Sequence, residues 1–453
     1  MTKQEAAIKY ITENYLDYRR LRHDIVADKL QVRMEKPTPD PFLKDGGNSA
    51  VHKSFPSGED LGEAAVWREM TKNDINSIVC HCAVEYNANI TSREVVTALQ
   101  SDIIPDVHPL REYILSLEPY TPGQIDWIDF VAQQVRVAAY PQPLPEGKGV
   151  SAAQKSFPLG EDLGEADRLW RVCFKKWFVA MVASWMKDDV VNHQVLVLIG
   201  RQGIYKTTWL EHLIPPHLRA YACKLANSND LNKDERLRIA EFGLISLDEI
   251  DSMNNRELNQ LKSIITSTDV NERAAYAYTK ERRVRLASFC ASGNRKDFLT
   301  DITGNRRWLP FEVESIQNPF FTILPYDLMY AQAWALANNS TFNYWFDLDE
   351  IETIEQHNQQ FRDESNEEQL IDVYFSVPAE GAIKAKFLTT AEISERLIYF
   401  GNIKRPLTLS RLGVLLSQKG FVSVRRGTPC RRGWLIYERD TEEVNSNRMR
   451  LAK

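Results

Sequence analysis

Residues 193–209, HQVLVLIGRQGIYKTTW, contain a strand signal, a glycine-containing turn and a helix signal in that order. The apolar run that opens the stretch is typical of a strand buried in a parallel sheet, where both faces are covered. The residues after the turn have helical character until two prolines at 215–216 end it. A strand, a glycine turn and a helix in this order predict an α/β domain.

The turn matches, with one exception, the phosphate-binding pattern G-x-x-x-x-G-K-[ST]. Gly200, Lys206 and Thr207 occupy their expected places, and Tyr205 stands where the second glycine belongs. In such a loop the lysine reaches the β- and γ-phosphates, the threonine hydroxyl binds Mg²⁺, and backbone N–H groups face the phosphates. The candidate nucleotide-binding residues are Gly200, Gly203, Tyr205, Lys206, Thr207 and Thr208.

The tyrosine is compatible with the loop if its φ angle is negative, because a positive φ is costly for a residue with a Cβ. Its ring then either points outward or stacks near the nucleotide. Two outcomes stay open, namely a loop that supports hydrolysis and a loop that binds nucleotide without turnover.

A second apolar run, GLISLDEI at Gly243–Ile250, predicts another buried strand that ends in paired carboxylates. Asp248 suits the binding of Mg²⁺, and Glu249 suits activation of the attacking water. The alternative is an acidic helix cap after a strand. The match to both motifs, in this order and each behind a strand, favours a nucleotide site.

A third strand is predicted over Arg285–Asn294, RLASFCASGN. The amide of Asn294 at its tip is suited to orient water and to sense the γ-phosphate. The following stretch DITGNRRW contains Arg306 and Arg307, which could stabilise charge at the nucleotide of a neighbouring subunit. A surface arginine pair is the alternative.

The order and spacing of these motifs resemble those of the virulence-associated E (VapE/VirE-type) P-loop ATPases of phages and integrated mobile elements. The resemblance covers Gly200–Glu312 and rests on GRQGIYKTTW, LDEID, LNQLKSIIT, ERAAY, ASGN, FLTD and TGNRRWLPFEV. It implies an α/β P-loop NTPase core related to AAA+ and superfamily-3 helicases. Such a core uses ATP and Mg²⁺, works on DNA as a homo-oligomeric ring such as a hexamer, and is often encoded beside or fused to a primase.

The resemblance also implies roles for single residues. Asn294 would be the polar sensor, and Arg306 or Arg307 the finger that acts across a subunit interface. Residues 271–285, NERAAYAYTKERRVR, would form a hairpin in the channel of the ring, and an ordinary charged hairpin or helix end is the alternative. The residues expected to contact single-stranded DNA there are Lys280, Arg282 and Arg283, with Tyr276 and Tyr278 as stacking faces.

The C-terminal region has a winged-helix pattern. Residues 388–400 and 407–420 show helical periodicity behind a Ser or Thr cap, and residues 421–438 alternate on both sides of a Gly/Pro turn. Between positions 400 and 437 there are eight Lys or Arg and no acidic residue, in a chain of net charge −6. The expected phosphate contacts are Arg411, Lys419, Arg425, Arg426, Arg431 and Arg432. A winged helix that binds protein through a solvated basic face is the alternative.

Length and composition limit the class of protein. A chain of 453 residues allows two to three domains, and 43% hydrophobic with 26% charged residues is typical of globular proteins. The sequence has neither an apolar run of about 18 residues nor a secretory signal at its start. These features favour a cytoplasmic protein without a membrane partner.

The predicted organisation has four parts. Residues 1–150 are expected to be mainly helical, including one helix over residues 5–30, and residues 151–345 to form the P-loop ATPase domain. Residues 346–385 are expected to be a linker and residues 386–453 the basic winged-helix-like domain. A segment at 53–64, KSFPSGEDLGEA, returns at 155–166 with one difference, and both copies are expected to be surface loops without a catalytic role.

Three functions compete at this stage. The first is an ATP-hydrolysing DNA motor, a replicative helicase of a phage or integrated mobile element. The second is a nucleotide-binding regulator on DNA in which Tyr205 blocks turnover. The third is part of a primase–helicase. Residues 1–150 argue against it, because they lack a clear carboxylate triad or zinc ligands.

Overall fold

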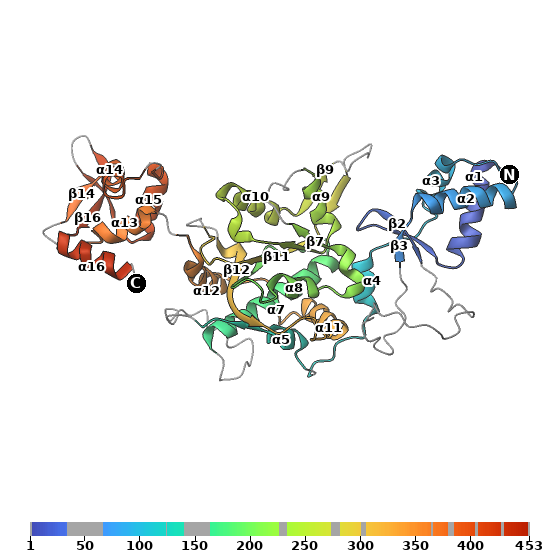
Figure 1. Cartoon of the computed structure of the whole chain (residues 1–453), viewed down its shortest axis with the longest axis horizontal. Helices are drawn as coiled ribbons and strands as arrows, with labels where there is room; N and C mark the ends of the chain where they lie inside the picture. The colour runs from blue at the N-terminus through green and yellow to red at the C-terminus, as the bar shows by residue number, and fades with distance from the viewer. Residues whose placement is uncertain are drawn as a thin grey trace, which may run out of the picture. The chain divides into compact units, whose positions relative to one another are not determined.

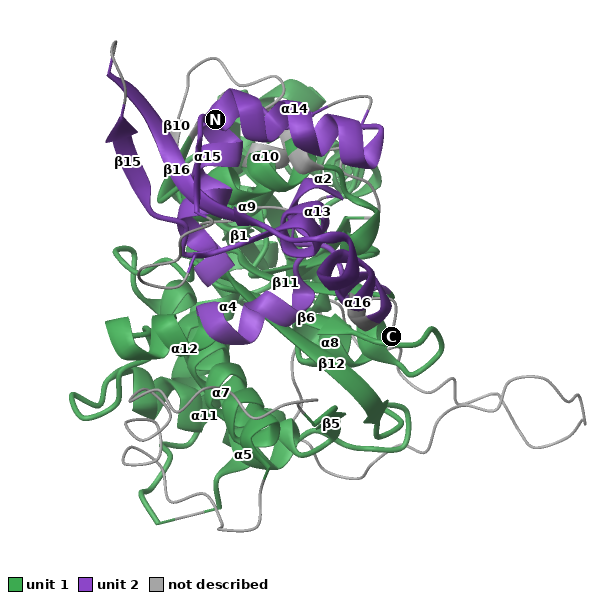
Figure 2. Ribbon diagram, turned by 90° about the vertical axis from the view of Figure 1, so that its left-hand side faces the viewer, with its two compact units in different colours: residues 1–294, 307–354 green, residues 295–306, 355–453 purple. Residues whose placement is uncertain are grey.

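The computed structural model divides the chain into two compact units, coloured separately in Figure 2. Unit 1 comprises residues 1–294 and 307–354, and unit 2 comprises residues 295–306 and 355–453. The structure describes residues 2–33, 67–123, 125–139, 164–225, 233–272, 281–299, 305–363, 366–378, 385–403, 406–426 and 430–451. Within these ranges no helix combines the length and the apolar character that a bilayer crossing needs.

A six-stranded sheet forms the centre of unit 1, with strand order β5-β12-β6-β11-β8-β7. Its strands are β5 (Val135–Val137), β6 (Val195–Ile199), β7 (Ala222–Leu225), β8 (Leu244–Leu247), β11 (Ser288–Gly293) and β12 (Trp308–Ile316). All neighbours pair in parallel except β5, which runs antiparallel to β12 at one edge. The three strands expected from the sequence are β6, β8 and β11, and the predicted α/β class with a parallel sheet is confirmed.

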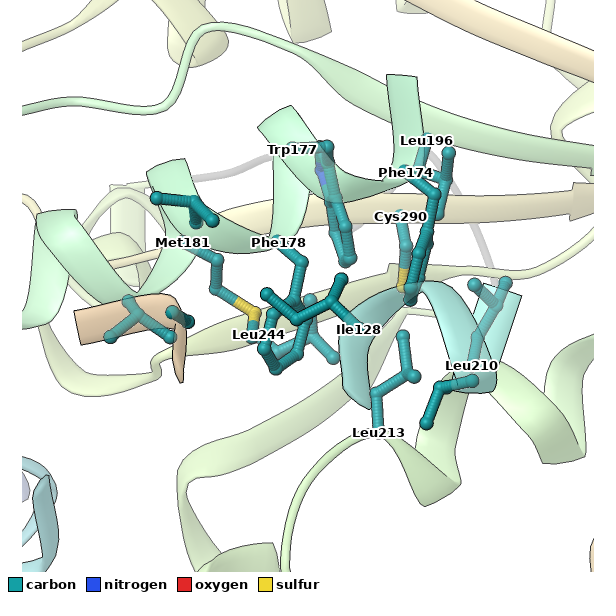
Figure 3. Close-up of a cluster of buried hydrophobic side chains, with 14 of the residues drawn as sticks. Ile128, Phe174, Trp177, Phe178, Met181, Leu196, Leu210, Leu213, Leu244 and Cys290 are labelled. Carbon is teal, nitrogen blue, oxygen red and sulfur yellow. The ribbon is translucent and has the colours of Figure 1, made fainter. Parts of the chain in front are cut away.

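Helices α5 (Trp127–Ala132), α7 (Glu165–Met186), α8 (Lys206–His212) and α11 (Tyr326–Ala337) pack on this sheet. α5, α7 and α11 lie together on one side in Figure 1. Figure 3 shows Phe174, Trp177 and Phe178 of α7 in the apolar cluster that also holds Leu196 of β6 and Leu210 of α8. Because α7 is buried on nearly every face from Val172 to Trp185, it anchors the sheet. Its two buried lysines form ion pairs, Lys175 with Asp126 and Lys176 with Glu350.

The central region of the chain contains further elements. They are α4 (Pro109–Ser116), η2 (Pro216–Tyr221), α9 (Lys233–Glu241), η4 (Ile250–Ser252), α10 (Asn255–Thr266), β9 (Asp269–Glu272), β10 (Glu281–Val284), η5 (Asn305–Arg307) and α12 (Leu348–Asn358). β9 and β10 pair antiparallel in a sheet of their own.

The N-terminal region contains a sheet that the sequence analysis did not predict. It comprises α1 (Lys3–Ile11), η1 (Thr12–Leu16), β1 (Leu21–Asp24), β2 (Lys29–Arg33), β3 (Trp67–Glu69), α2 (Lys72–Glu85), α3 (Ser92–Leu99) and β4 (Asp106–Val107), with strand order β3-β2-β1-β4. The expectation of one helix over residues 5–30 is therefore wrong. Arg19 and Asp28 have positive φ angles of 52° and 54°, which interrupt a helix, and Leu21 and Val32 then bury as a strand pair.

Unit 2 has a small core of its own around Phe375, Leu412 and Trp434. Its elements are η6 (Gln359–Phe361), α13 (Asn366–Tyr374), β13 (Phe375–Ser376), β14 (Lys386–Leu388), α14 (Thr390–Gly401), α15 (Leu409–Gln418), β15 (Ser423–Arg426), β16 (Arg431–Glu438) and α16 (Thr441–Leu451). The predicted order of two helices and a hairpin corresponds to α14, α15 and β15–β16. Residues 346–385 differ from the expected linker, because they contain α12 and α13, and Ile371 belongs to the core of unit 2.

The repeated segments lie largely outside the described residues. The structure does not describe the first copy, at 53–64, or the second copy up to residue 163. The second copy ends inside helix α7, at Glu165 and Ala166, so its end is not the expected loop.

Candidate functional site

Three neighbouring parallel strands, β6, β11 and β8, have their carboxyl ends at one edge of the sheet. The residues at and after these ends enclose a cavity of about 300 Å³. Its lining residues are Gln202, Gly203, Tyr205, Lys206, Thr207, Thr208, Asp248, Glu249, Ser292, Gly293 and Asn294. Segments that are separated by about 40 and 90 positions in the chain thus meet at one place, which is where open α/β sheets hold their ligands.

Lys206 is the first residue of α8, and its ammonium group lies inside the cavity wall. Nζ donates hydrogen bonds to the carbonyl oxygens of Gly200 and Arg201, at 2.7 Å each, and to Oδ1 of Asn294 at 3.3 Å. Burial lowers the pKa of this lysine, although the carboxylates of Asp251 and Asp248 oppose that shift. The ammonium group is therefore pre-placed between the loop and the tip of β11.

A cluster of oxygen atoms lies opposite the lysine. Oδ1 of Asp248 accepts hydrogen bonds from Ser292 Oγ at 2.8 Å and from Thr207 Oγ1 at 3.1 Å, and the two hydroxyls are 2.8 Å apart. Lys224 Nζ lies 2.8 Å from the other oxygen, Oδ2. Burial alone would raise the pKa of Asp248, but the hydrogen bonds from Lys224, Ser292 and Thr207 lower it below its ordinary value. A carboxylate flanked by two hydroxyls is the oxygen-only donor set that suits Mg²⁺.

Glu249 and Asn294 complete the acidic side of the cavity. Glu249 is exposed and has a left-handed backbone with φ 52° where it caps η4. The backbone N–H of Asn294 donates to Oδ1 of Asp251 at 3.1 Å, so this second aspartate fixes the tip of β11. Sequence reasoning had assigned no role to Asp251, Ser292 or Lys224. Ser292 lies two positions before Asn294 and so shares its strand end, whereas the position of Lys224 on β7 follows only from the sheet order.

Two glycines of the loop between β6 and α8 occupy positions where a side chain would clash or strain the backbone. A Cβ on Gly200 would lie 2.6 Å from the carbonyl oxygen of Val313 in β12, and Gly203 has a φ of 85°. The expectation of a negative φ at Tyr205 is wrong, because the residue has φ 67° and ψ 17°. A non-glycine residue held in this region costs on the order of 1–3 kcal/mol. Tyr205 is the N-cap residue of α8, so the turn into this helix sets these angles, which glycine would adopt without strain.

The comparison with known families agrees with the motif order. Residues 153–363 match the model of the virulence-associated protein E-like domain. The central region of the chain is a virulence-associated protein E-like domain. No curated protein matches the chain.

Solved structures give a weaker likeness. The apo structure of the NrS-1 C terminal region (305-718) aligns with a TM-score of 0.40 at 10% identity, covering 96% of this chain and 99% of that one. An A form apo structure of the same region gives a TM-score of 0.39 at 11% identity, with 97% and 100% covered. Likeness at this level carries no argument about this chain.

Within the virulence-associated protein E-like domain, the two candidate finger arginines lie away from the cavity lining. Arg306 and Arg307 belong to η5, directly before β12. The first residue of β12, Trp308, pairs with Val195 at the amino end of β6, so Arg307 lies at the opposite edge of the sheet from the cavity. The strand register therefore places Arg307 away from the cavity, and a role of Arg306 or Arg307 in a neighbouring subunit's site stays a prediction.

The residues of the domain that are predicted to contact DNA belong to the segment 271–285. Tyr276, Tyr278 and Lys280 lie outside the described residues, and Arg282 is described only by its backbone pairing with Asn271. Arg283 is mostly buried, with Nη2 2.8 Å from Asp28 and Nη1 3.6 Å from Glu241. These ion pairs occupy Arg283 within the protein, which speaks against a phosphate contact in this arrangement.

In unit 2 the basic residues that were predicted to contact phosphates divide into two groups, one paired within the unit and one exposed. Lys419 caps the C-terminus of α15, and its Nζ pairs with Asp372 at 2.6 Å, so its charge is used inside the unit. Arg411 is exposed on α15. The other four arginines that were predicted to contact phosphates form exposed cross-strand pairs in the β15–β16 hairpin, Arg425 with Arg432 and Arg426 with Arg431. Like charges placed directly opposite each other destabilise a hairpin, so this arrangement favours an anionic partner.

Proposed function

We propose that the virulence-associated protein E-like domain is a P-loop ATPase of the AAA+/superfamily-3 type that drives a DNA-associated motor, a replicative helicase of a phage or integrated mobile element. The observation that supports this most directly is the meeting of Lys206, Thr207, Asp248, Glu249 and Asn294 at one cavity. These residues come from three separate strand ends. The convergence of a cation, a hydroxyl–carboxylate cluster and a further carboxylate is what phosphoryl transfer to water requires.

Each residue has a distinct task in this proposal. Lys206 exchanges its carbonyl partners for oxygens of the β- and γ-phosphates, and the N–H groups of the 200–205 loop and of α8 bind the same phosphates. Thr207 and Asp248 hold Mg²⁺, with Ser292 beside them, and the ion neutralises charge on the phosphates when bound. Glu249 accepts a proton from the attacking water, which Asn294 orients.

Unit 2 provides the second part of the proposal. α14, α15 and the β15–β16 hairpin have the element order of a winged helix, and the four hairpin arginines are suited to DNA phosphates. A homo-oligomeric ring with single-stranded DNA in its channel, and a primase as a partner, completes the proposed motor.

Steady-state ATP hydrolysis by the full chain, with Mg²⁺ and with or without single-stranded DNA, tests the activity. We expect turnover that DNA stimulates, and a loss on the order of 100-fold for Lys206→Ala, because the main cation at the phosphates is removed. Lys72→Ala, an exposed lysine of α2, is the matched control and should leave the rate unchanged.

Two results would separate the alternatives. Tight ATP binding without turnover would support a nucleotide-gated DNA-binding regulator, which the strained Tyr205 beside the phosphates could produce. An absence of ATP binding would contradict both functions.

A further inference from the structure

The charged and hydroxyl groups that line the cavity are suited to phosphates and metal, and they leave the base of a nucleotide without a binding surface. The sheet order decides where that base must lie. β11 and β8, with Asn294 and Asp248, flank β6 on one side, and β12 flanks it on the other. A triphosphate whose γ-phosphate faces the carboxylates therefore extends through the loop toward the carboxyl end of β12.

An aromatic group lies on that side. The segment 317–325 follows β12, and the ring of Phe320 contacts Tyr205 edge-to-face, with centroids 6.4 Å apart and planes at 82°. Phe320 also contacts His212 in the last turn of α8, at 5.6 Å and 85°. Tyr205 itself lines the cavity. The aromatic platform, defined as Tyr205 and Phe320 with His212 behind them, is therefore continuous with the phosphate cavity.

The platform is held in place by hydrogen bonds. Asn318 Oδ1 accepts from the N–H of Phe320 at 3.0 Å, and its backbone oxygen accepts from Phe321 N at 3.1 Å and from Thr322 Oγ1 at 3.1 Å. Asn318 Nδ2 lies 3.4 Å from the hydroxyl of Tyr205. Phe320 is nevertheless 66% exposed. An aromatic ring fixed in a bonded turn, but open to solvent beside a polar cavity, is preorganised for a planar partner.

We propose that the base of the bound nucleoside triphosphate packs against the Tyr205–Phe320 platform, where it stacks on one ring and meets the other, which lies at 82° to it, edge-on. This inference rests on the proposed triphosphate site. It also accounts for the tyrosine at a glycine position, because the stacking energy offsets the backbone strain of the left-handed conformation. Purines offer a larger stacking face than pyrimidines, so the platform favours ATP or GTP over CTP or UTP.

Isothermal titration calorimetry on the full chain with Mg²⁺ tests the platform with two probes that differ in the nucleoside. The probes are the β,γ-imido analogue of ATP and inorganic tripolyphosphate. We expect Phe320→Ala and Tyr205→Gly to weaken the analogue about tenfold or more and to leave tripolyphosphate unchanged. Tyr205→Gly is informative because glycine adopts the observed φ without strain, so misfolding of the loop cannot explain a loss.

The control variant removes a ring outside the platform. Phe321→Ala, at a neighbouring residue that is 87% exposed, keeps both rings of the platform and should bind the analogue like the wild type. Equal binding of the analogue by wild type and both platform variants would overturn the platform, and so would an equal loss for both probes. If the wild type bound neither probe, the triphosphate site itself would be refuted.

Discussion

Gly200 and Gly203 hold the loop of the candidate site for two different reasons. Gly200 lacks room for a Cβ, which would lie 2.6 Å from a backbone oxygen of β12, whereas Gly203 has open space but a φ of 85°. The first constraint is steric and concerns every side chain. The second is conformational, and asparagine meets it better than most residues.

Substitutions by asparagine should separate these two constraints. Gly203→Asn is expected to retain most of the affinity for the imido analogue of ATP, while Gly200→Asn loses it and lowers the stability by about 1–3 kcal/mol through overpacking. Calorimetry and thermal unfolding measure both effects. Equal losses for the two variants would show that the contact with β12 does not matter.

Lys224 competes with any cation for Asp248, because its Nζ lies 2.8 Å from Oδ2. We expect Lys224→Met to lower the Mg²⁺ concentration at half-saturation by about threefold, since a partly exposed ion pair is worth less than about 1 kcal/mol. The measurement is a Mg²⁺ titration of nucleotide binding at constant ionic strength. Lys224→Arg keeps the charge and serves as the control.

The same variant should change the pH dependence of metal uptake. Lys224 is among the groups that lower the pKa of Asp248, so its removal lets that pKa rise. The acid limit of Mg²⁺ binding is then expected to move to higher pH. If Mg²⁺ binding is lost at the same low pH in Lys224→Met and in the wild type, the Lys224–Asp248 ion pair does not influence Mg²⁺ binding.

At the scale of helices and strands, the elements that could be predicted from the sequence include buried strands of the central sheet. β6, β8 and β11 could be read from the sequence because strands covered on two faces are continuous apolar runs. The proximity of their tips followed from the parallel arrangement. β2, β3 and β4 were missed because most of their residues are partly or fully exposed, and β1 because its buried residues include the charged Arg22 and Asp24. The turns beside these strands use non-glycine residues such as Arg19 in the left-handed region.

Asp24 links one of these missed elements to the central domain. It is fully buried and accepts hydrogen bonds from Val26 N, Ala27 N, Gln31 Nε2 and Tyr221 Oη, at 2.6–3.1 Å. Asp24→Ala should destabilise the β1–β2 hairpin on the order of 3 kcal/mol, because several buried donors lose their acceptor. Tyr221→Phe removes one of these bonds and should cost about 1 kcal/mol.

Amide hydrogen exchange of residues 21–33 measures this loss locally. We expect faster exchange there in Asp24→Ala, with little change in β6 or β11. Protection equal to that of the wild type would contradict the anchoring role.

At the scale of the whole molecule, charge is distributed unevenly. The chain carries −6 overall, yet the β15–β16 hairpin places two arginine pairs across its strands. Because such pairs repel each other, the hairpin is expected to be more stable without them and to bind nucleic acid less well. Their position could not be predicted as cross-strand pairs, since the register depends on the turn.

The double variant Arg425→Ser, Arg426→Ser removes one member of each pair. We expect weaker binding of single-stranded DNA in fluorescence anisotropy, a slope of log K against log salt reduced by about 0.7 for each lost phosphate contact, and an equal or higher unfolding temperature. Weaker binding with an unchanged salt slope would show that the arginines do not contact phosphates.

The hydrogen bonds of Lys206 to Gly200 and Arg201 have a consequence for anion selectivity. The ammonium group has hydrogen-bond acceptors from its own chain, so an incoming anion must supply substitutes for several acceptors at once. Sulfate or a single phosphate offers few oxygens for this exchange, while a polyphosphate chain can follow the loop and replace them together. Extended, multiply charged ligands are therefore expected to bind at Lys206 in preference to common buffer anions, which should be poor competitors.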